Sequence, residues 1–261
     1  MELGLRNKTA IITGGSRGIG QAIAGRLAEE GCQLHLVARS GDDLEATASL
    51  IREQYKVSVQ THSMDLAESR NVSRLAELAS NADILINNAG AIPAGALQSV
   101  DEGAWRTAWD LKVYGYINLC RAMYAHMQKR GSGVIINVIG IAGGEVEEFN
   151  YITGTTGNAG LAAFTRALGS GSPADNIRVV GINPGMTATD RLVSLMKQNA
   201  EARGIEPENW RQLTGDMPFG RPAEPEEVAD LAVFLASERA AYMSGTVVTI
   251  DGGLSARGKL F

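Results

Sequence analysis

Histidine and cysteine, two of the side chains that most often bind transition metals, are scarce in this chain. Its 261 residues contain three histidines, His35, His62 and His126, and two cysteines, Cys32 and Cys120. None of them follows a spacing typical of a metal site, so we expect no bound metal. Both cysteines lie in predominantly apolar stretches, which favours buried free thiols over a disulfide.

The chain also lacks a large excess of either charge and lacks long apolar runs. Lysine and arginine number 24 against 29 aspartates and glutamates, which gives a net charge of -5. Nothing in this balance points to nucleic acid or an anionic membrane as a partner. No apolar run reaches the roughly 20 residues of a membrane span, and Met1 lies too close to the first expected strand for a signal peptide. We therefore expect a cytoplasmic protein that acts on a small molecule.

Apolar segments typical of buried strands alternate with helical patterns along the whole chain. The expected strands cover residues 9–12, 33–38, 57–62, 82–87, 133–138, 177–182 and 246–250. This alternation predicts a Rossmann-like α/β fold, a doubly wound parallel sheet of about seven strands with helices on both faces. No linker or repeat interrupts the pattern, so we expect one domain over residues 1–261. Residues 189–219 are the predicted insertion, placed where a substrate lid would lie.

A glycine-rich turn separates the first expected strand from the first expected helix. Residues 13–20 have the sequence TGGSRGIG. Gly14 permits a turn at positive φ, Gly18 leaves room for a phosphate, and Gly20 lets the helix approach the strand. Free N–H groups at the start of the helix would then hold the phosphates. The pattern predicts a nucleotide-binding site.

Five motifs, in the expected order, resemble those of the short-chain dehydrogenase/reductase family. They are TGGSRGIG at 13–20, NNAG at 87–90, NPG at 183–185, FGRP at 219–222 and IDGG at 250–253. The resemblance covers almost the whole chain. It implies a single doubly wound domain, a nicotinamide cofactor and a homo-oligomer, either a tetramer or a dimer.

The glycine turn and the resemblance together indicate which residues contact the cofactor. Asp65 and Leu66 would face the adenine, although Asp65 could instead be a turn residue that starts a helix. Asn88 would pass under the adenosine ribose or cap a strand end, and Pro184 would flank the nicotinamide. The full set of predicted contacts is Gly14, Ser16, Arg17, Gly18, Ile19, Gly20, Arg39, Asp65, Leu66, Asn88, Ala89, Gly90, Pro184, Gly185, Thr187 and Thr189.

Two arginines favour NADP(H) over NAD(H). An enzyme that prefers NAD carries a carboxylate at the end of the second strand, which holds the ribose 2′-hydroxyl. Here that position is Ala38, followed by Arg39, and Arg17 lies in the glycine turn. Two guanidinium groups and no carboxylate suit a 2′-phosphate. The alternative interpretation is a pair of solvated surface arginines.

All four catalytic positions that the resemblance implies are changed in this chain. The family uses a Tyr, a Lys four residues later, a Ser after the fifth strand and an Asn in the preceding helix. In this chain the corresponding residues are Gly154, Asn158, Gly140 and Lys112. The Lys and the Asn therefore look exchanged between two helices. A phenol titrates near pH 10, so a nearby ammonium is needed to favour phenolate.

Three hypotheses about the active site follow. We favour the first, a rearranged active site, because random loss of catalytic residues would not place a Lys where it can replace the lost Lys. In it, Lys112 supplies the ammonium, Asn158 takes the role of the exchanged Asn, and Tyr151, one turn before the expected Tyr, is the proton donor. A threonine at 153, 155 or 156 could replace the Ser hydroxyl. The chain would then be an NADP(H)-dependent oxidoreductase that interconverts a carbonyl and an alcohol on a small apolar substrate.

The second hypothesis is a catalytically inactive nucleotide-binding protein. The third is a non-redox lyase or hydratase on the same fold, in which Lys112 or a glutamate at 145, 147 or 148 does acid–base work. Fold alone does not choose among the three hypotheses, because one fold serves many chemistries.

Overall fold

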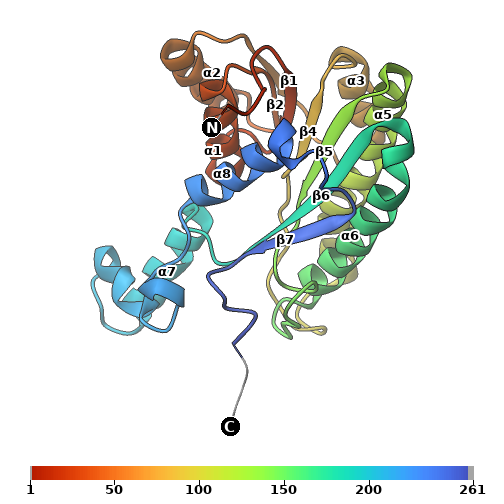
Figure 1. Cartoon of the computed structure of the whole chain (residues 1–261). Helices are drawn as coiled ribbons and strands as arrows, with labels where there is room; N and C mark the ends of the chain where they lie inside the picture. The colour runs from red at the N-terminus through yellow and green to blue at the C-terminus, as the bar shows by residue number, and fades with distance from the viewer. Residues whose placement is uncertain (1, 258–261) are drawn as a thin grey trace.

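All seven strands of the structure run parallel, and they form one twisted sheet in the order β3-β2-β1-β4-β5-β6-β7 (Figure 1). The structure is a computed structural model and describes residues 2–257. The strands are β1 (Thr9–Thr13), β2 (Gln33–Ala38), β3 (Val59–Ser63), β4 (Ile84–Asn87), β5 (Gly133–Val138), β6 (Ile177–Pro184) and β7 (Thr246–Ile250). Their bounds differ from the expected ones by at most two residues. The predicted fold class is confirmed.

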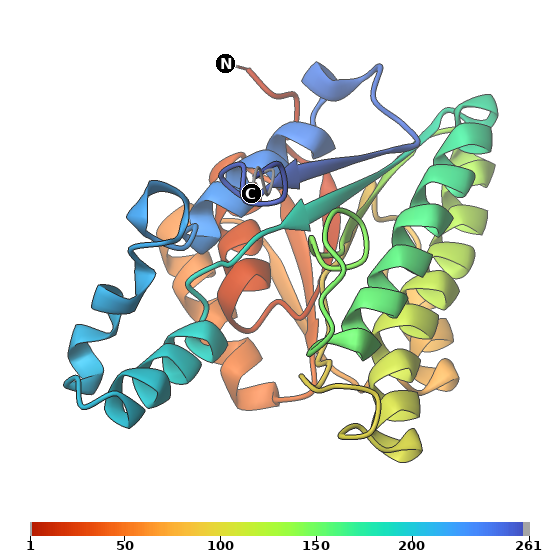
Figure 2. The same ribbon diagram turned by 90° about the horizontal axis from the view of Figure 1, so that it is seen from below.

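Helices cover both faces of the sheet (Figures 1 and 2). They are α1 (Gly18–Glu29), α2 (Gly41–Tyr55), α3 (Ser69–Leu78), α4 (Glu102–Trp109), α5 (Gly115–Arg130), α6 (Ile152–Gly171), α7 (Asp190–Ala202) and α8 (Pro225–Ala236). Helices α1, α2 and α8 pack on one face, and α3, α5 and α6 pack on the other. Neighbouring residues of β1 show this division, because Ile12 faces the first layer, Ile11 faces the second, and both are fully buried.

The strand order reverses between β1 and β4, whose carboxyl ends therefore diverge around a crevice. The Thr13 hydroxyl holds the two ends together, since it accepts the backbone N–H groups of Asn88 (2.9 Å) and Ala89 (3.0 Å). The glycine turn after β1 and the NNAG segment after β4 are thus fixed next to each other.

The helical region expected over residues 101–130 contains a break that the sequence pattern did not indicate. Between α4 and α5, residues Asp110–Tyr114 form a π-helical turn, η1. Such turns are rare and occur often at functional sites. Lys112 lies in this turn, so its side chain leaves the helix from a locally widened backbone.

The predicted insertion forms a projection beside the sheet, drawn in cyan and light blue in Figure 1. It contains α7 and two short 3-10 segments, Pro207–Thr214 and Pro218–Gly220. Buried Met196 and Trp210 pack with neighbouring apolar side chains into a small core of its own. The insertion is therefore an ordered element in its own right.

Both cysteines are buried free thiols, as expected. The histidines, which are scattered in the sequence, are not all isolated in the fold. His35 on β2 and His62 on β3 stack with their rings nearly parallel, and His35 Nδ1 lies 2.9 Å from His62 Nε2. Within residues 2–257 no three metal-binding side chains gather into a site, and no helix is both long and apolar enough to cross a membrane.

Candidate functional site

A cleft of about 780 Å³ runs along the carboxyl edge of the sheet, between the glycine turn, the NNAG segment and the start of α7. Eleven of the predicted cofactor residues line it: Gly14, Ser16, Arg17, Gly18, Ile19, Arg39, Leu66, Asn88, Ala89, Gly90 and Thr189. The lining of the cleft does not include the other five predicted residues, which are Gly20, Asp65, Pro184, Gly185 and Thr187. Sequence motifs from distant parts of the chain thus meet around one crevice.

The glycine turn has the backbone geometry of a phosphate cradle. Gly14 and Gly18 adopt φ of 66° and 56°, which side-chain-bearing residues rarely do. A Cβ on Gly20 would overlap the carbonyl oxygen of Gly14, so only glycine lets α1 start this close to the strand. The Asn88 amide donates to the carbonyl of Thr13 (3.1 Å) and so braces the turn. These residues fit the diphosphate of a dinucleotide.

Asp65 and Asn88 also have the structural roles considered as alternatives above. The Asp65 carboxylate accepts the backbone N–H of Ala67 (3.0 Å) and so caps a turn, and its neighbour Leu66 lines the cleft. Asn88 does both, because it fastens β4 to the glycine turn and borders the cleft.

The charged side chains of the cleft carry a small positive excess. Arg17 and Arg39 are exposed, and within residues 2–257 neither forms an ion pair. Sequence analysis missed three further charged residues in the lining, Asp43, Asp190 and Arg191. Their positions depend on how α2 and α7 pack against the sheet, which no local motif indicates.

Lys112 points into the protein and reaches the end of β5. Its stem passes Gly90 so closely that a Cβ on that glycine would lie 3.0 Å from Lys112 Cδ. Its Nζ donates to the carbonyl oxygen of Ile139 (2.6 Å), directly before Gly140. Burial, with a smaller contribution from the positive charge of Arg191, lowers the pKa of Lys112 to about 8. The ammonium therefore lies beside the position at which the family has its Ser.

The Tyr151 ring fills the space that a side chain at Gly154 would enter. It directly precedes α6, and a Cβ on Gly154 would overlap the Cε1 and Cζ atoms of its ring. A side chain at residue 154 and the Tyr151 ring therefore exclude each other. Burial raises the pKa of Tyr151, and the charge of Arg191 acts in the opposite direction.

Asn158 lies beside the missing Ser side chain. Gly140 adopts φ of 130°, and a Cβ there would lie 3.2 Å from Asn158 Nδ2. Asn158 is only 2% exposed, and its Oδ1 has no hydrogen-bond partner within residues 2–257. Because buried polar atoms almost always find a partner, this oxygen needs one from a bound molecule or a water.

Neighbouring aromatic residues hold the start of α6 in place. Trp109 Nε1 donates to the carbonyl of Thr153 (3.1 Å), and a Cβ on Gly157 would lie only 3.2 Å from the same nitrogen. The Tyr116 hydroxyl donates to the carbonyl of Val138 (3.0 Å) on β5. Two aromatic residues that flank the π turn thus tie it to the start of α6 and to the end of β5.

The other groups considered for acid–base work are placed less favourably. The hydroxyls of Thr155 and Thr156 donate to the backbone carbonyls of Glu148 and Ile152. The Thr153 hydroxyl is buried without a partner within residues 2–257. The three glutamates at 145, 147 and 148 are exposed.

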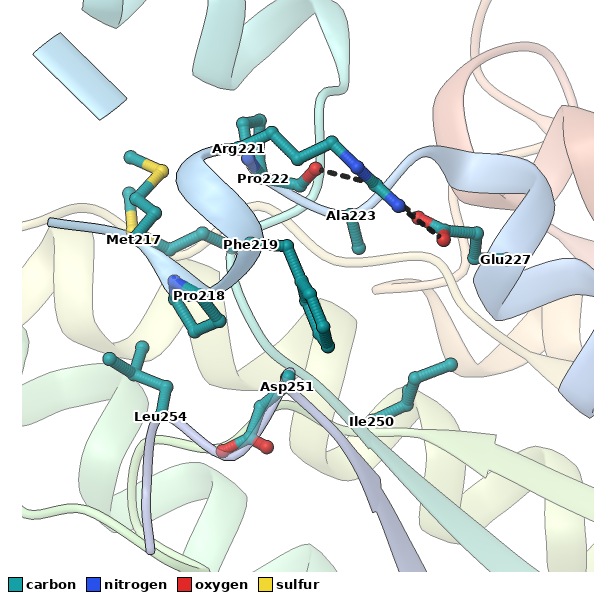
Figure 3. A pocket seen from close by; sticks show the side chains of 12 residues that line it. Met217, Pro218, Phe219, Arg221, Pro222, Ala223, Glu227, Ile250, Asp251 and Leu254 are labelled. Atoms are coloured by element: carbon teal, nitrogen blue, oxygen red, sulfur yellow. Dashed lines mark hydrogen bonds and ion pairs between the residues drawn. The ribbon is translucent and has the colours of Figure 1, made fainter. Parts of the chain in front are cut away.

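A second cavity, of about 290 Å³, lies where the insertion meets the carboxyl end of β7 (Figure 3). The Phe219 ring points toward Ile250 and Asp251, and the Arg221–Glu227 ion pair borders the cavity. None of the three predicted catalytic residues lines it. The cavity is therefore separate from the group formed by Lys112, Tyr151 and Asn158.

Comparison with known proteins agrees with this geometry. Residues 14–255 match a family model described as enoyl-(acyl carrier protein) reductase. The chain is 35% identical to the 3-oxoacyl-[acyl-carrier-protein] reductase of Chlamydia trachomatis, over 96% of this chain and 98% of that protein. It is 31% identical to a 3alpha-hydroxysteroid dehydrogenase of Mediterraneibacter gnavus, over 95% and 97%.

Among solved structures, the L-sorbose reductase of Gluconobacter frateurii, complexed with NADPH and L-sorbose, superposes with a TM-score of 0.92. The two sequences are 33% identical, and the match covers 99% of this chain and all of the other. With the parallel sheet, the glycine cradle and the family model in agreement, the chain belongs to the short-chain dehydrogenase/reductase family and is an oxidoreductase.

Proposed function

We propose that this protein is an NADP(H)-dependent oxidoreductase that interconverts a carbonyl and an alcohol through a rearranged active site. The observation that carries the proposal is the Tyr151 ring in the space of a side chain at Gly154. In this proposal Tyr151 supplies, from one turn earlier, the phenol that position 154 lacks.

Lys112, Tyr151 and Asn158 divide the work in this proposal. The bound nicotinamide supplies or accepts the hydride. In reduction, the Tyr151 hydroxyl gives its proton to the carbonyl oxygen, and the Lys112 ammonium favours the phenolate that remains. An Asn158 amide N–H donates to the same carbonyl oxygen and stabilises the charge that develops on it. In oxidation the proton moves in the opposite direction.

The two exposed guanidinium groups of Arg17 and Arg39 support NADP(H) as the preferred cofactor. They line the cleft without ion pairs within the described residues and can bind a 2′-phosphate through paired N–H donors. The sorbose reductase structure contains NADPH. Arg39→Asp should weaken NADPH binding at least tenfold more than NADH binding, measured by titration of cofactor fluorescence. Equal losses for both cofactors would contradict the preference.

The lid, the assembly and the substrate class are further parts of the proposal. We treat residues 1–261 as one domain in which residues 189–219 cover the substrate, since α7 borders the cleft. A tetramer or a dimer is proposed from the family to which the chain belongs. The small apolar substrate stays a prediction from the sequence, because the apolar second cavity lies apart from Lys112, Tyr151 and Asn158.

Turnover measured at the nicotinamide absorbance band tests the proposal. NADPH should be oxidised in the presence of at least one member of a panel of small ketones and aldehydes. Tyr151→Phe and Lys112→Ala should each lower kcat about 100-fold or more, the usual contribution of a positioned proton donor. Tyr114→Phe and Lys129→Ala, which alter exposed residues of the same helical region, are the matched controls and should leave kcat unchanged.

Two outcomes of this experiment would replace the proposal. NADPH binding without turnover of any panel member would identify an inactive nucleotide-binding protein. Conversion of a substrate without a change in nicotinamide absorbance would identify a lyase or hydratase.

A further inference from the structure

Arg191, in the first turn of α7, crosses the cleft from one wall to the other. Its Nη2 donates to the carbonyl oxygen of Ile92 (2.7 Å), just beyond the NNAG segment. Within residues 2–257 no carboxylate forms an ion pair with it. A guanidinium has five donors, so one bond to a neutral carbonyl leaves most of its capacity and all of its charge available.

The start of α7 lies directly against the glycine turn. A Cβ on Gly18 would lie 3.1 Å from Cγ2 of Thr189, two residues before Arg191. Arg191, Ser16 and Gly18 line the same cleft. An anion held by the glycine turn would therefore have the Arg191 side chain within reach from the opposite wall.

The charge of Arg191 also acts on two of the proposed catalytic residues. It adds to the lowering of the Lys112 pKa, and it opposes the rise in the Tyr151 pKa that burial causes. The Lys112 stem passes close to Gly90, which lines the cleft together with Arg191. Arg191 is therefore near both the phosphate cradle and Lys112, as a residue that contacts the middle of an extended dinucleotide would be.

We propose that Arg191 binds the diphosphate of the nicotinamide dinucleotide, on the side opposite the glycine turn, and gives up its bond to Ile92 in doing so. Its forked N–H groups match two phosphate oxygens, a contact that an apolar side chain or a lysine at this position would not reproduce. The inference rests on the proposed nicotinamide cofactor but not on the proposed catalysis. An oxyanion on the substrate, such as a carboxylate, is the other source of the same chemistry.

Three ligands separate the diphosphate from the 2′-phosphate. NADPH has both groups, NADH has only the diphosphate, and adenosine 2′-monophosphate has a 2′-phosphate without any 5′-phosphate. Calorimetric titration of Arg191→Gln should show NADPH and NADH weakened by the same factor, about tenfold or more. Its affinity for adenosine 2′-monophosphate should match that of the unaltered protein.

Two further variants provide the controls. Arg39→Gln should show the complementary pattern, with NADPH and adenosine 2′-monophosphate weakened and NADH unchanged. Arg203→Gln changes an exposed arginine at the opposite end of α7 and should leave all three affinities unchanged. Arg191→Lys should recover only part of the lost affinity, because it keeps the charge without the fork.

Three results would overturn the inference. Unchanged nucleotide affinities in Arg191→Gln, with KM raised only for carboxylate-bearing carbonyl substrates, would assign the anion to the substrate. Equal weakening of all three ligands would show a general disturbance of the cleft. Absence of nucleotide binding in the unaltered protein would remove the inference together with the cofactor. The expected binding pattern without any turnover would support Arg191 as assigned while contradicting the proposed function.

Discussion

Lys112 carries an ammonium group in a place from which most water is excluded. It reaches that place because a π turn directs it past Gly90, which has no side chain to obstruct it. Its bond to Ile139 satisfies one donor, and burial brings its pKa down to about 8. A group that titrates this close to neutral pH can change its charge under ordinary assay conditions.

The pH dependence of catalysis should report this titration. The proposed mechanism needs the ammonium, so kcat/KM for carbonyl reduction should fall as the pH rises through about 8. In Lys112→Arg the guanidinium stays charged throughout, and the alkaline decline near pH 8 should disappear from whatever activity remains. An unchanged profile in this variant would show that another group controls the decline. The measurement is the pH profile of kcat/KM at saturating cofactor.

Gly154 has no side chain and so leaves space for the Tyr151 ring. Gly154→Ala should push the Tyr151 ring from its place and lower kcat at least tenfold, because the added Cβ overlaps the ring. It should also destabilise the fold by about 1–3 kcal/mol, the usual cost of overpacking. Gly160→Ala in the same helix is the matched control, since a Cβ there meets nothing within 4 Å. The control should be stabilised by about 0.5–1 kcal/mol and keep its activity.

Thermal unfolding and steady-state kinetics of the two alanine variants measure both effects. Full activity in Gly154→Ala would show that the Tyr151 ring can be displaced without consequence, and would argue against its proposed role.

At the scale of elements, the pairing of β2 with β3 brings two histidines into contact. Register places His35 opposite Gln60 and Val37 opposite His62, so the two imidazoles meet diagonally on one face of the sheet. Burial, with a smaller contribution from the His62 charge, lowers the pKa of His35 to about 4. Burial and then the charge of Arg74 lower the pKa of His62. Both rings are therefore neutral in the folded protein near pH 7.

This pair should make the protein sensitive to mild acid. A depressed pKa means that the unfolded chain binds the proton more tightly, so stability is present above about pH 6.5 and is lost as the pH falls toward 4. His35 alone should cost about 2 kcal/mol between pH 7 and pH 5. Urea unfolding of His35→Leu should lack this part of the decline, whereas His126→Gln, which changes a histidine outside the pair, should keep it. Identical declines in all three proteins would assign the acid sensitivity elsewhere.

At the scale of the whole molecule, the cofactor should join parts that otherwise pack separately. The insertion has its own small core, while the glycine turn belongs to the sheet and its helices. A ligand between them stabilises the folded state by mass action, about 2.7 kcal/mol at 100 times its Kd. For a chain of this length we expect NADPH at that concentration to raise Tm by about 5–10 °C.

Limited proteolysis extends this prediction to the insertion. Cleavage between residues 203 and 216, where the chain leaves α7 and enters the 3-10 segments, should slow when NADPH is present. A rise in Tm without protection of this segment would show that the insertion does not close over the cofactor.

Much of the architecture follows from local patterns. Each strand is an apolar segment bounded by polar or glycine-rich residues, and each helix has its own periodicity, so the order of elements and the parallel sheet are predictable. The glycine turn was likewise predictable, because Gly14 and Gly20 belong to one strand–turn–helix unit, in which a Cβ on Gly20 would overlap the carbonyl oxygen of Gly14. The resemblance to the family also predicts, from the sequence, that Gly154, Asn158 and Lys112 stand at positions where the family has catalytic side chains.

The sequence by itself therefore determined the fold class and the cradle, because each depends on residues close together in the chain or on motif order. Only the tertiary structure decided how the proposed catalytic residues are placed. The Tyr151 ring lies over Gly154, Lys112 reaches Ile139, and Arg191 spans the cleft to Ile92. The contact between Tyr151 and Gly154 is local, but the direction of the ring depends on how the chain enters α6. The Lys112 and Arg191 contacts join residues 27 and 99 positions apart, through a π turn and the projection of α7, so no short-range pattern encodes them.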